Sequence, residues 1–158
     1  MSQTDTGFSN RWMMFQRMNT CDRSIKNARV KVRVRYHECD PMGVVHHSVY
    51  PIWFELARTE LLRCQGSAYK DLEAEGVHFV VARLNMRFRR PARYDDVLVV
   101  RAEVAGHYAN SRSGKTLNHH YSIIRGEELL ASAESTLVCV DGGGKPRRMP
   151  EYLGHNQT

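Results

Sequence analysis

The sequence predicts an α+β fold in which an antiparallel sheet wraps around one long, buried helix. The chain has 158 residues, of which 42% are hydrophobic and 25% are charged, as expected for a single globular domain. One helical segment is apolar on most of its circumference, so other structure must enclose it. The strands after it follow one another through short turns, as in an antiparallel sheet, and no other helix is apolar enough to cover that sheet.

The two ends of the chain are expected to lie outside this domain. We expect an N-terminal extension over residues 1–27, partly disordered because its start is polar, and a C-terminal tail over 153–158. A single domain then occupies residues 28–152. No apolar run approaches the ~18–20 residues that span a bilayer, and the apolar stretch near Trp12 is too short and too charged for a signal peptide. We therefore expect no membrane span and a cytoplasmic protein.

The first strand is predicted over residues 28–37. Apolar and aromatic side chains alternate there with Lys, Arg and His, and this period of two is typical of a half-buried strand. The residues expected to face the core are Val30, Val32, Val34 and Tyr36.

The long helix is predicted over residues 48–65. Helical spacing places one apolar face at Tyr50, Trp53, Phe54, Ala57, Leu61 and Cys64. The apolar surface is extended around the first half by Val49, Ile52 and Leu56. Pro51 falls in the first turn, where its missing N–H costs little, and Gly66 supplies the stop signal. A shorter helix is expected over residues 68–75.

Four further strands are predicted from alternating polarity. The residues expected on one face are Val80, Ala82, Leu84, Met86 and Phe88 in the first, Leu98, Val100, Ala102 and Val104 in the second, Leu117, His119, Tyr121 and Ile123 in the third, and Leu129, Ala131, Ala133, Ser135, Leu137 and Cys139 in the fourth. A hairpin at Arg125–Gly126–Glu127 joins the last two strands. Because neighbouring residues of a strand point to opposite faces, His119 and His120 cannot serve one site.

The segment between the first strand and the long helix carries the most unusual chemistry of the chain. Residues 40–43, Asp-Pro-Met-Gly, have the order of a type I turn. Asp40, His46 and His47 then lie at the entrance to a helix whose N-terminal amides attract negative charge. A carboxylate, imidazoles and backbone donors suit attack on an ester or a thioester, with the oxyanion held by N–H groups.

Charge and cysteine content narrow the choice of partners. A formal net charge of +6 and a pI near 9.4 favour an anionic partner, either nucleic acid or a phosphorylated small molecule such as a nucleotide-bearing cofactor. The chain lacks the aromatic and basic motif of a known nucleic-acid reader, so we expect no nucleic acid. The four cysteines, at 21, 39, 64 and 139, show no C-x-x-C spacing and are expected to be reduced thiols.

A dense motif covers residues 30–63. It consists of Val34-Arg-Tyr-His-Glu-Cys-Asp40, Gly43-Val-Val-His-His47, Tyr50 and Trp53-Phe-Glu-Leu-Ala-Arg-Thr-Glu-Leu-Leu-Arg63, with a weaker continuation in Arg89-Arg-Pro-Ala-Arg-Tyr-Asp-Asp96. This motif resembles the 4-hydroxybenzoyl-CoA thioesterase family of hotdog-fold proteins. The resemblance implies a hotdog fold, a homodimer or homotetramer with active sites at the dimer interface, and hydrolysis of an acyl-CoA to a carboxylic acid and free CoA. It implies no bound cofactor, because CoA arrives with the substrate.

The resemblance also assigns roles by position in the motif. Asp40 matches the catalytic carboxylate, which acts as a nucleophile or a general base. His47 would receive the carbonyl oxygen on its backbone N–H, and Glu55 matches a helix Glu that is catalytic in some hotdog branches. The implied substrate-binding residues are Gly43, Val45, His46 and Tyr50, with Arg89, Arg90 and Arg112 as candidates for the CoA phosphates.

Other interpretations of these residues stay open. Without the family, Asp40 is a turn residue and Glu55 is a salt-bridge partner of a nearby arginine. A zinc site at His37, Cys39, Asp40 and either His46 or His47 has suitable residue types, but its spacing matches no familiar pattern, so we expect no metal. The alternative functions are a hotdog hydratase or dehydratase acting on acyl thioesters, and a non-catalytic module that binds acyl-CoA or nucleic acid.

Overall fold

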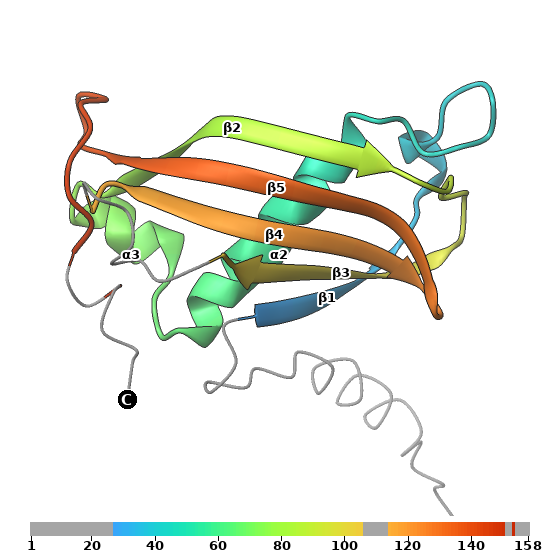
Figure 1. Ribbon diagram of the computed structural model, residues 1–158, viewed down its shortest axis with the longest axis horizontal. Helices are drawn as coiled ribbons and strands as arrows, with labels where there is room; N and C mark the ends of the chain where they lie inside the picture. Colours follow the sequence, from blue (N-terminus) through green and yellow to red (C-terminus); the bar gives the residue numbers. More distant parts are fainter. Residues whose placement is uncertain (1–26, 106–113, 151–152, 154–158) are drawn as a thin grey trace, which may run out of the picture.

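The computed structural model describes residues 27–105, 114–150 and 153, and it contains a five-stranded antiparallel sheet with a long helix across one face (Figure 1). The strands are β1 (Asn27–Arg33), β2 (His78–Phe88), β3 (Val97–Val104), β4 (Thr116–Arg125) and β5 (Glu128–Val140). The helical elements are the 3₁₀ turn η1 (Tyr36–Glu38), the long helix α2 (Val49–Cys64) and the short helix α3 (Tyr69–Ala74). The strand order is β1-β3-β4-β5-β2, with every neighbouring pair antiparallel. The predicted α+β hotdog fold is confirmed.

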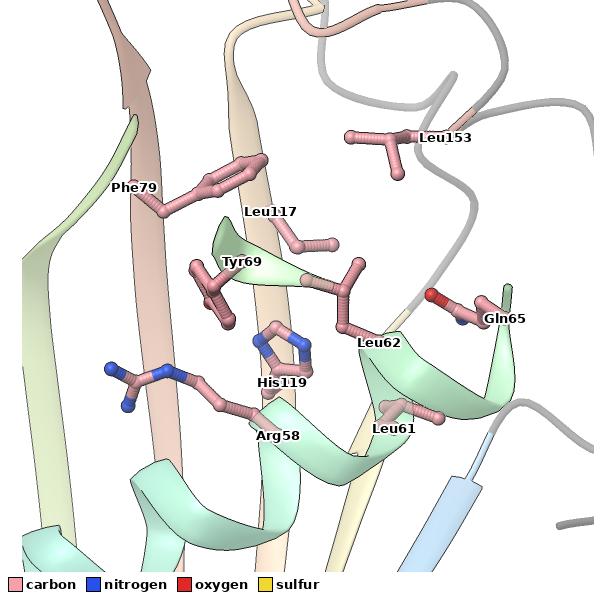
Figure 2. Close-up of a pocket in the computed structure, with 9 residues that line it drawn as sticks. All are labelled: Arg58, Leu61, Leu62, Gln65, Tyr69, Phe79, Leu117, His119 and Leu153. Carbon is pink, nitrogen blue, oxygen red and sulfur yellow. The ribbon is translucent and has the colours of Figure 1, made fainter. Parts of the chain in front are cut away.

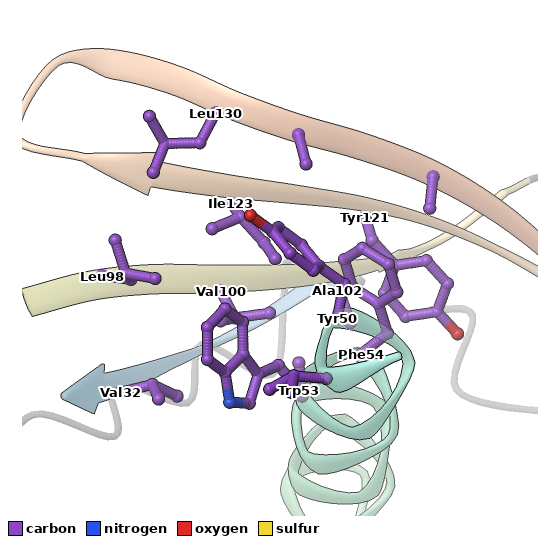
Figure 3. Packing of buried hydrophobic residues seen from close by; sticks show 14 of the residues in the cluster. Val32, Tyr50, Trp53, Phe54, Leu98, Val100, Ala102, Tyr121, Ile123 and Leu130 are labelled. Atoms are coloured by element: carbon purple, nitrogen blue, oxygen red, sulfur yellow. The ribbon is translucent and has the colours of Figure 1, made fainter. Parts of the chain in front are cut away.

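The hydrophobic core lies between α2 and the sheet (Figure 3). α2 packs against β1 and β3, and the ring of Phe54 lies 4.8 Å from that of Tyr121 on β4. The buried residues of α2 are Val49, Tyr50, Trp53, Phe54, Ala57 and Leu61. The predicted inward face is therefore confirmed from Tyr50 to Leu61, while Cys64 is half-buried. Each large apolar side chain buried here contributes roughly 1.5–3 kcal/mol, so this contact is a main source of stability.

The other side of α2 is open in a single chain. Ile52 is 65% exposed and Leu56 is 46% exposed. The expectation that other structure encloses this largely apolar helix therefore holds for one of its faces within a single chain, because a single sheet covers a single face. Ile52 and Leu56 therefore form an exposed apolar surface on that side of the helix.

The first strand is shorter than its polarity pattern predicted. β1 ends at Arg33, and Val34 leaves the ladder to exchange backbone hydrogen bonds with residues 95 and 96. The chain then enters η1, where Tyr36 is 80% exposed rather than facing the core. The polarity pattern did not predict the end of β1, because the alternation of residue types continues beyond Arg33. The backbone hydrogen bonds between strands stop there and are replaced by local ones.

Bulges shift the inward face of two strands. In β2 the register slips between Val81 and Arg83, which leaves Ala82 unpaired. Phe79 and Val81 therefore lie opposite the buried Cys139 and Leu137, and the predicted inward positions of Val80 and Ala82 are wrong. A second slip, between Ile123 and Ile124 of β4, makes Leu130 of β5 buried in place of the predicted Leu129.

The remaining elements follow the sequence closely. All predicted inward residues of β3 and β4 are buried, and α3 lies inside the range predicted for the short helix. Leu153 is buried in a small second cluster with Leu72, Val77 and Cys139. Cys39, Cys64 and Cys139 form no disulfide in the part of the chain that the structure describes, and Cys21 lies outside it. Within the described ranges, no helix is long and apolar enough to cross a membrane.

Candidate functional site

The carboxylate of Asp40 is fixed by the turn that it begins. The Gly43 N–H donates to the Asp40 carbonyl at 2.9 Å, which closes the predicted turn, and Gly43 takes a φ of +72°. The Met42 N–H donates to Asp40 Oδ1 at 2.9 Å, and the Val44 N–H lies 3.5 Å from the same oxygen. The Asp40 N–H donates to the Val44 carbonyl at 2.8 Å. Asp40 is half-buried, so its carboxylate is held in place and remains accessible.

Glu38 anchors the residues just before this turn. Its carboxylate is buried and accepts the Arg35 N–H at 2.7 Å and the Trp53 indole N–H at 3.4 Å. Its carbonyl accepts the His46 N–H at 2.9 Å, and the backbones of Cys39 and Val45 form an isolated antiparallel β-bridge. Both arms of the loop that carries Asp40 are therefore tied to each other and to α2. The motif contained Glu38, but its anchoring role was not predicted.

A second support comes from the segment between β2 and β3. The Val45 N–H donates to the Ala92 carbonyl at 2.9 Å, and Arg93 Nη1 lies 3.4 Å from the Gly43 carbonyl. This segment is itself held by Asp96, which accepts the Arg93 N–H at 2.8 Å and pairs with Arg125 at 2.6 Å. Val45, which the sequence assigned to substrate binding, is 5% exposed and belongs to the core.

A free backbone donor lies at the start of α2. The N–H of His46 donates to Glu38, that of Ser48 to His46 Nδ1 at 3.3 Å, and that of Val49 to the His46 carbonyl at 3.0 Å. The N–H of His47 makes no hydrogen bond to any part of the chain that the structure describes. An unpaired N–H at a helix N-terminus is suited to bind an anion or a polarised carbonyl oxygen.

The two imidazoles of the loop contact each other. The rings of His46 and His47 have centroids 4.1 Å apart, both side chains are exposed, and His46 Nδ1 shares a hydrogen bond of 2.8 Å with Ser48 Oγ. Neither ring forms a hydrogen bond to Asp40 within the described residues. The structure therefore offers the His47 amide as a donor and leaves its ring free at the surface.

Glu55 and Tyr50 project from α2 in different environments. Glu55 is exposed and pairs with Arg58 at 2.9 Å, so the predicted salt bridge is confirmed. Tyr50 is buried beside Phe88, with ring centroids 4.9 Å apart. Burial raises the pKa of the Tyr50 phenol, and a hydrogen bond with the Ala92 backbone offsets part of this rise. Tyr50 therefore contacts Ala92, the residue whose carbonyl also accepts the Val45 N–H of the loop.

The predicted phosphate-binding arginines are spread along the surface. Arg89 and Arg90 follow β2, and their backbone N–H groups donate to the Leu130 carbonyl at 2.8 and 3.1 Å. Arg90 also pairs with Glu128 at 3.3 Å. Arg112 lies outside the described residues. Arg93, which contacts Gly43, is closer to the Asp40 turn than its place in the sequence indicated.

A separate, largely apolar pocket lies along the C-terminal half of α2 (Figure 2). Its lining residues are Arg58, Leu61, Leu62, Gln65, Tyr69, Phe79, Leu117, His119 and Leu153. The cavity measures about 10 Å³, room for about one water molecule. His119 is 4% exposed, its Nδ1 has no partner in the described part of the chain, and burial together with the charge of Arg58 lowers its pKa from 6.5 to about 3.

The chemistry of the Asp40 turn is that of a carboxylate and a backbone donor at one helix entrance. Within the described residues, no group of three or more His, Cys, Asp or Glu side chains could hold a metal ion. A fixed carboxylate can attack a carbonyl carbon or remove a proton from water, and an unpaired amide can hold the oxygen that gains charge.

Known proteins resemble this chain over most of its length. The family model described as Thioesterase-like superfamily matches residues 34–156. The acyl-CoA thioester hydrolase YbgC of Escherichia coli O6:H1 is 39% identical over 124 residues, which cover 77% of this chain and 89% of that protein.

Solved structures show the same likeness. The hypothetical protein TT1821 from Thermus thermophilus matches with a TM-score of 0.74 and 38% identity, covering 81% of this chain and 95% of that one. A thioesterase complexed with coenzyme A and Zn, also from Thermus thermophilus, matches with a TM-score of 0.70 and 30% identity, covering 84% of this chain and 91% of that one. The matched family region includes the Asp40 turn, α2 and strands β2 to β5.

Proposed function

Because this chain belongs to the thioesterase-like superfamily, we propose that it hydrolyses an acyl-CoA thioester to a carboxylic acid and free CoA, with Asp40 as the reacting carboxylate. The chain is a thioester hydrolase by family. The acyl-CoA substrate is supported by the names of its relatives, among them the acyl-CoA thioester hydrolase YbgC and a thioesterase complexed with coenzyme A. The basic charge of +6 suits the phosphates of such a substrate.

Two routes are open to the Asp40 carboxylate. As a nucleophile, it attacks the thioester carbonyl carbon, the C–S bond breaks, and the CoA thiolate leaves and takes up a proton. Water then hydrolyses the mixed anhydride, which releases the acid and restores the carboxylate. As a general base, it removes a proton from a water molecule whose oxygen attacks the same carbon, and the departing thiolate takes up that proton.

The backbone N–H of His47 would stabilise the developing oxyanion. Its neighbours at His46, Ser48 and Val49 are already occupied, while the His47 N–H itself is free to receive a substrate oxygen. The partial positive charge of the α2 N-terminus adds to its effect. The observation that carries the proposal is this free amide at a helix start whose preceding loop fixes the Asp40 carboxylate.

Thiol release from a panel of acyl-CoA thioesters tests the proposal. The panel runs from acetyl and butyryl through palmitoyl to benzoyl and 4-hydroxybenzoyl thioesters. Asp40→Asn should lower the rate by about 10²- to 10⁴-fold, the usual contribution of a positioned acid or base. Asp141→Asn is the matched control, since Asp141 Oδ1 accepts the Gly143 and Lys145 N–H groups at 2.9 Å in a turn at the other end of the sheet. Equal rates in wild type and Asp40→Asn would remove Asp40 from the reaction.

Residues Arg89, Arg90 and Arg112 remain our candidates for contacts with the CoA phosphates. Arg89 and Arg90 are exposed and lie in the motif that continues after β2. The proposed reaction needs no resident cofactor or metal, because CoA enters and leaves as part of the substrate. Activity that persists after dialysis against a chelator would agree with this, and activity abolished by the chelator and restored by a metal would contradict it.

We also propose that the chain assembles as a homodimer or homotetramer. β2 lies at the edge of the sheet, with Val81, Leu84 and Phe88 at least 37% exposed on the face that bears the core. Unpaired backbone groups along an edge strand favour pairing with another strand. Ile52 and Leu56 add exposed apolar surface on the open side of α2. Sedimentation velocity should show a dimer or tetramer, and a monomer at micromolar concentration would refute the assembly.

A further inference from the structure

Two tyrosines from distant segments meet beside the loop that carries Asp40. Tyr36 belongs to η1, and Tyr94 lies between β2 and β3, at the end of the sheet where the two segments come together (Figure 1). Their ring centroids are 5.5 Å apart and their planes are inclined at 83°. Tyr36 is 80% exposed and Tyr94 is 57% exposed. Because so much ring surface faces water, the pair contributes little to the core and offers aromatic faces to a planar ligand.

An arginine adjoins each tyrosine in the chain. The exposed side chains of Arg35 and Arg93 form no ion pair with a carboxylate in the part of the chain that the structure describes. The nearby carboxylates of Asp95 and Asp96 are already paired with other arginines, at 2.9 and 2.6 Å. The charges of these two guanidinium groups are therefore not neutralised by a carboxylate of the described residues, and Arg93 Nη1 also donates to the Gly43 carbonyl at 3.4 Å. Guanidinium groups bind phosphate oxygens well.

This cluster lies next to the proposed reacting groups. Tyr36 lies four residues before Asp40 in the chain, and Arg93 Nη1 contacts the Gly43 carbonyl at 3.4 Å. We call Tyr36, Tyr94, Arg35 and Arg93 the tyrosine rim. It combines aromatic faces, exposed cationic side chains and closeness to the Asp40 turn, which is the combination needed to hold a nucleotide while its flexible arm enters a site.

We propose that the tyrosine rim binds the adenine nucleotide of the CoA substrate, with the purine stacked on a tyrosine ring and with Arg35 and Arg93 adding to the phosphate contacts proposed above for Arg89, Arg90 and Arg112. This inference rests on the acyl-CoA thioesterase activity proposed above. The pantetheine arm is flexible and joins the nucleotide to the thioester, so it can fold back to bring the thioester to Asp40. The rim would then select for the carrier, while other parts of the site select the acyl group.

Kinetics with and without the nucleotide test this directly. The two substrates carry the same acyl group, one on CoA and the other on pantetheine. For Tyr36→Ala/Tyr94→Ala, kcat/KM on acyl-CoA should fall by about 5- to 150-fold, the usual effect of losing one base–aromatic stack. On acylpantetheine it should stay at the wild-type value. Tyr36→Phe/Tyr94→Phe keeps both rings and should behave as wild type. An equal loss on both substrates, or no loss on acyl-CoA, would overturn the proposal.

Direct binding separates failure of the rim from failure of the proposed activity. Adenosine 3′,5′-bisphosphate, titrated into the whole protein by calorimetry, should bind wild type and bind Tyr36→Ala/Tyr94→Ala and Arg93→Gln more weakly. Lys145→Gln carries the same charge change at the other end of the sheet and should bind as wild type. Loss of binding in the rim variants supports the rim even if wild type releases no thiol. Unchanged binding in them, or no binding to wild type, refutes it.

Discussion

Trp53 donates its indole N–H to the buried carboxylate of Glu38 across 3.4 Å, which links the core face of α2 to the residues just before Asp40. The other oxygen of the same carboxylate accepts the Arg35 N–H at 2.7 Å. One side chain therefore holds the loop against the helix, and the loop in turn fixes the proposed reacting groups. Substitutions that break this link should therefore change both the stability of the fold and the rate of the reaction.

Glu38→Ala should destabilise the protein and lower the rate together. Two donors lose their acceptor, and each buried group left unpaired costs about 1–3 kcal/mol. We expect a lower midpoint in urea unfolding and slower thiol release at saturating substrate. Trp53→Phe removes one hydrogen bond and keeps an aromatic ring in the core, so its effects should be smaller. Wild-type stability in Glu38→Ala would show that the carboxylate does not hold the loop.

Gly43→Ala should lower activity more than its modest effect on stability suggests. A left-handed backbone at a φ of +72° costs about 1–2 kcal/mol for a residue with a Cβ, and relief of this strain would shift the Asp40 turn. Gly126→Ala is the matched control, because Gly126 has a φ of +60° in the β4–β5 hairpin and nothing within 4 Å of its added Cβ. Thermal unfolding should show similar losses in both variants. Thiol release should fall in Gly43→Ala alone, and equal rates in the two would disconnect the turn from the reaction.

Glu55→Gln should leave most of the thiol release intact. The Glu55–Arg58 pair has one partner 65% exposed, and such surface pairs contribute about 0–1 kcal/mol, so the variant should also remain folded. Assays of thiol release and of hydration of an unsaturated acyl-CoA, run side by side with Asp40→Asn, decide the issue. A protein that survives Asp40→Asn but is inactive as Glu55→Gln would have the chemistry of a hotdog hydratase or dehydratase.

Stability should fall as the pH drops from about 6.5 toward 3, with a contribution from His119. Its pKa is about 3 in the folded protein and 6.5 when unfolded, so the unfolded state takes up the proton first in this window. Above pH 6.5 His119 is neutral in both the folded and the unfolded state, and its contribution to the free energy of unfolding is fully present. The loss is on the order of several kcal/mol. Urea unfolding at a series of pH values gives the free energy of unfolding as a function of pH. Between pH 6.5 and 3 this free energy should fall less steeply in His119→Phe than in wild type. Equal pH dependence in the two proteins would mean that His119 does not stay neutral in the folded state.

Much of the fold follows from residue patterns, because burial imposes a strict spacing. The helical period placed Tyr50, Trp53 and Phe54 inward, and the period of two placed Leu98 and Ile123 inward. The pattern failed where the ladder changed register. Ala82 is unpaired in β2, so the residues before it point to the opposite faces from those that strict alternation with the residues after it predicts. No change in residue type along the strand indicates this bulge.

The site was predictable in part, for a related reason. Turn chemistry identified Asp40 and Gly43, since few residue types suit those positions. The supports of the turn were not predictable from spacing, because Trp53 and Arg93 come from other parts of the chain and meet the loop only after folding. Tyr36 matched the strand pattern, yet its ring lies at the surface beside Tyr94, a pairing between distant parts of the chain that only the three-dimensional fold creates.

The two ends of α2 differ in a way that matters for laboratory evolution. The helix has 16 residues and is about 24 Å long, with the Asp40 turn at its start and the His119 pocket along its second half. A mutant library confined to the exposed residues of this loop, Pro41, Met42, His46, His47 and Ser48, should therefore vary turnover within a nearly constant melting temperature. A library at Leu61, Leu62 and Tyr69 should spread the melting temperature while turnover stays nearly constant. Thermal stability and turnover can thus be improved in separate rounds of mutagenesis, with little loss of one when the other is changed.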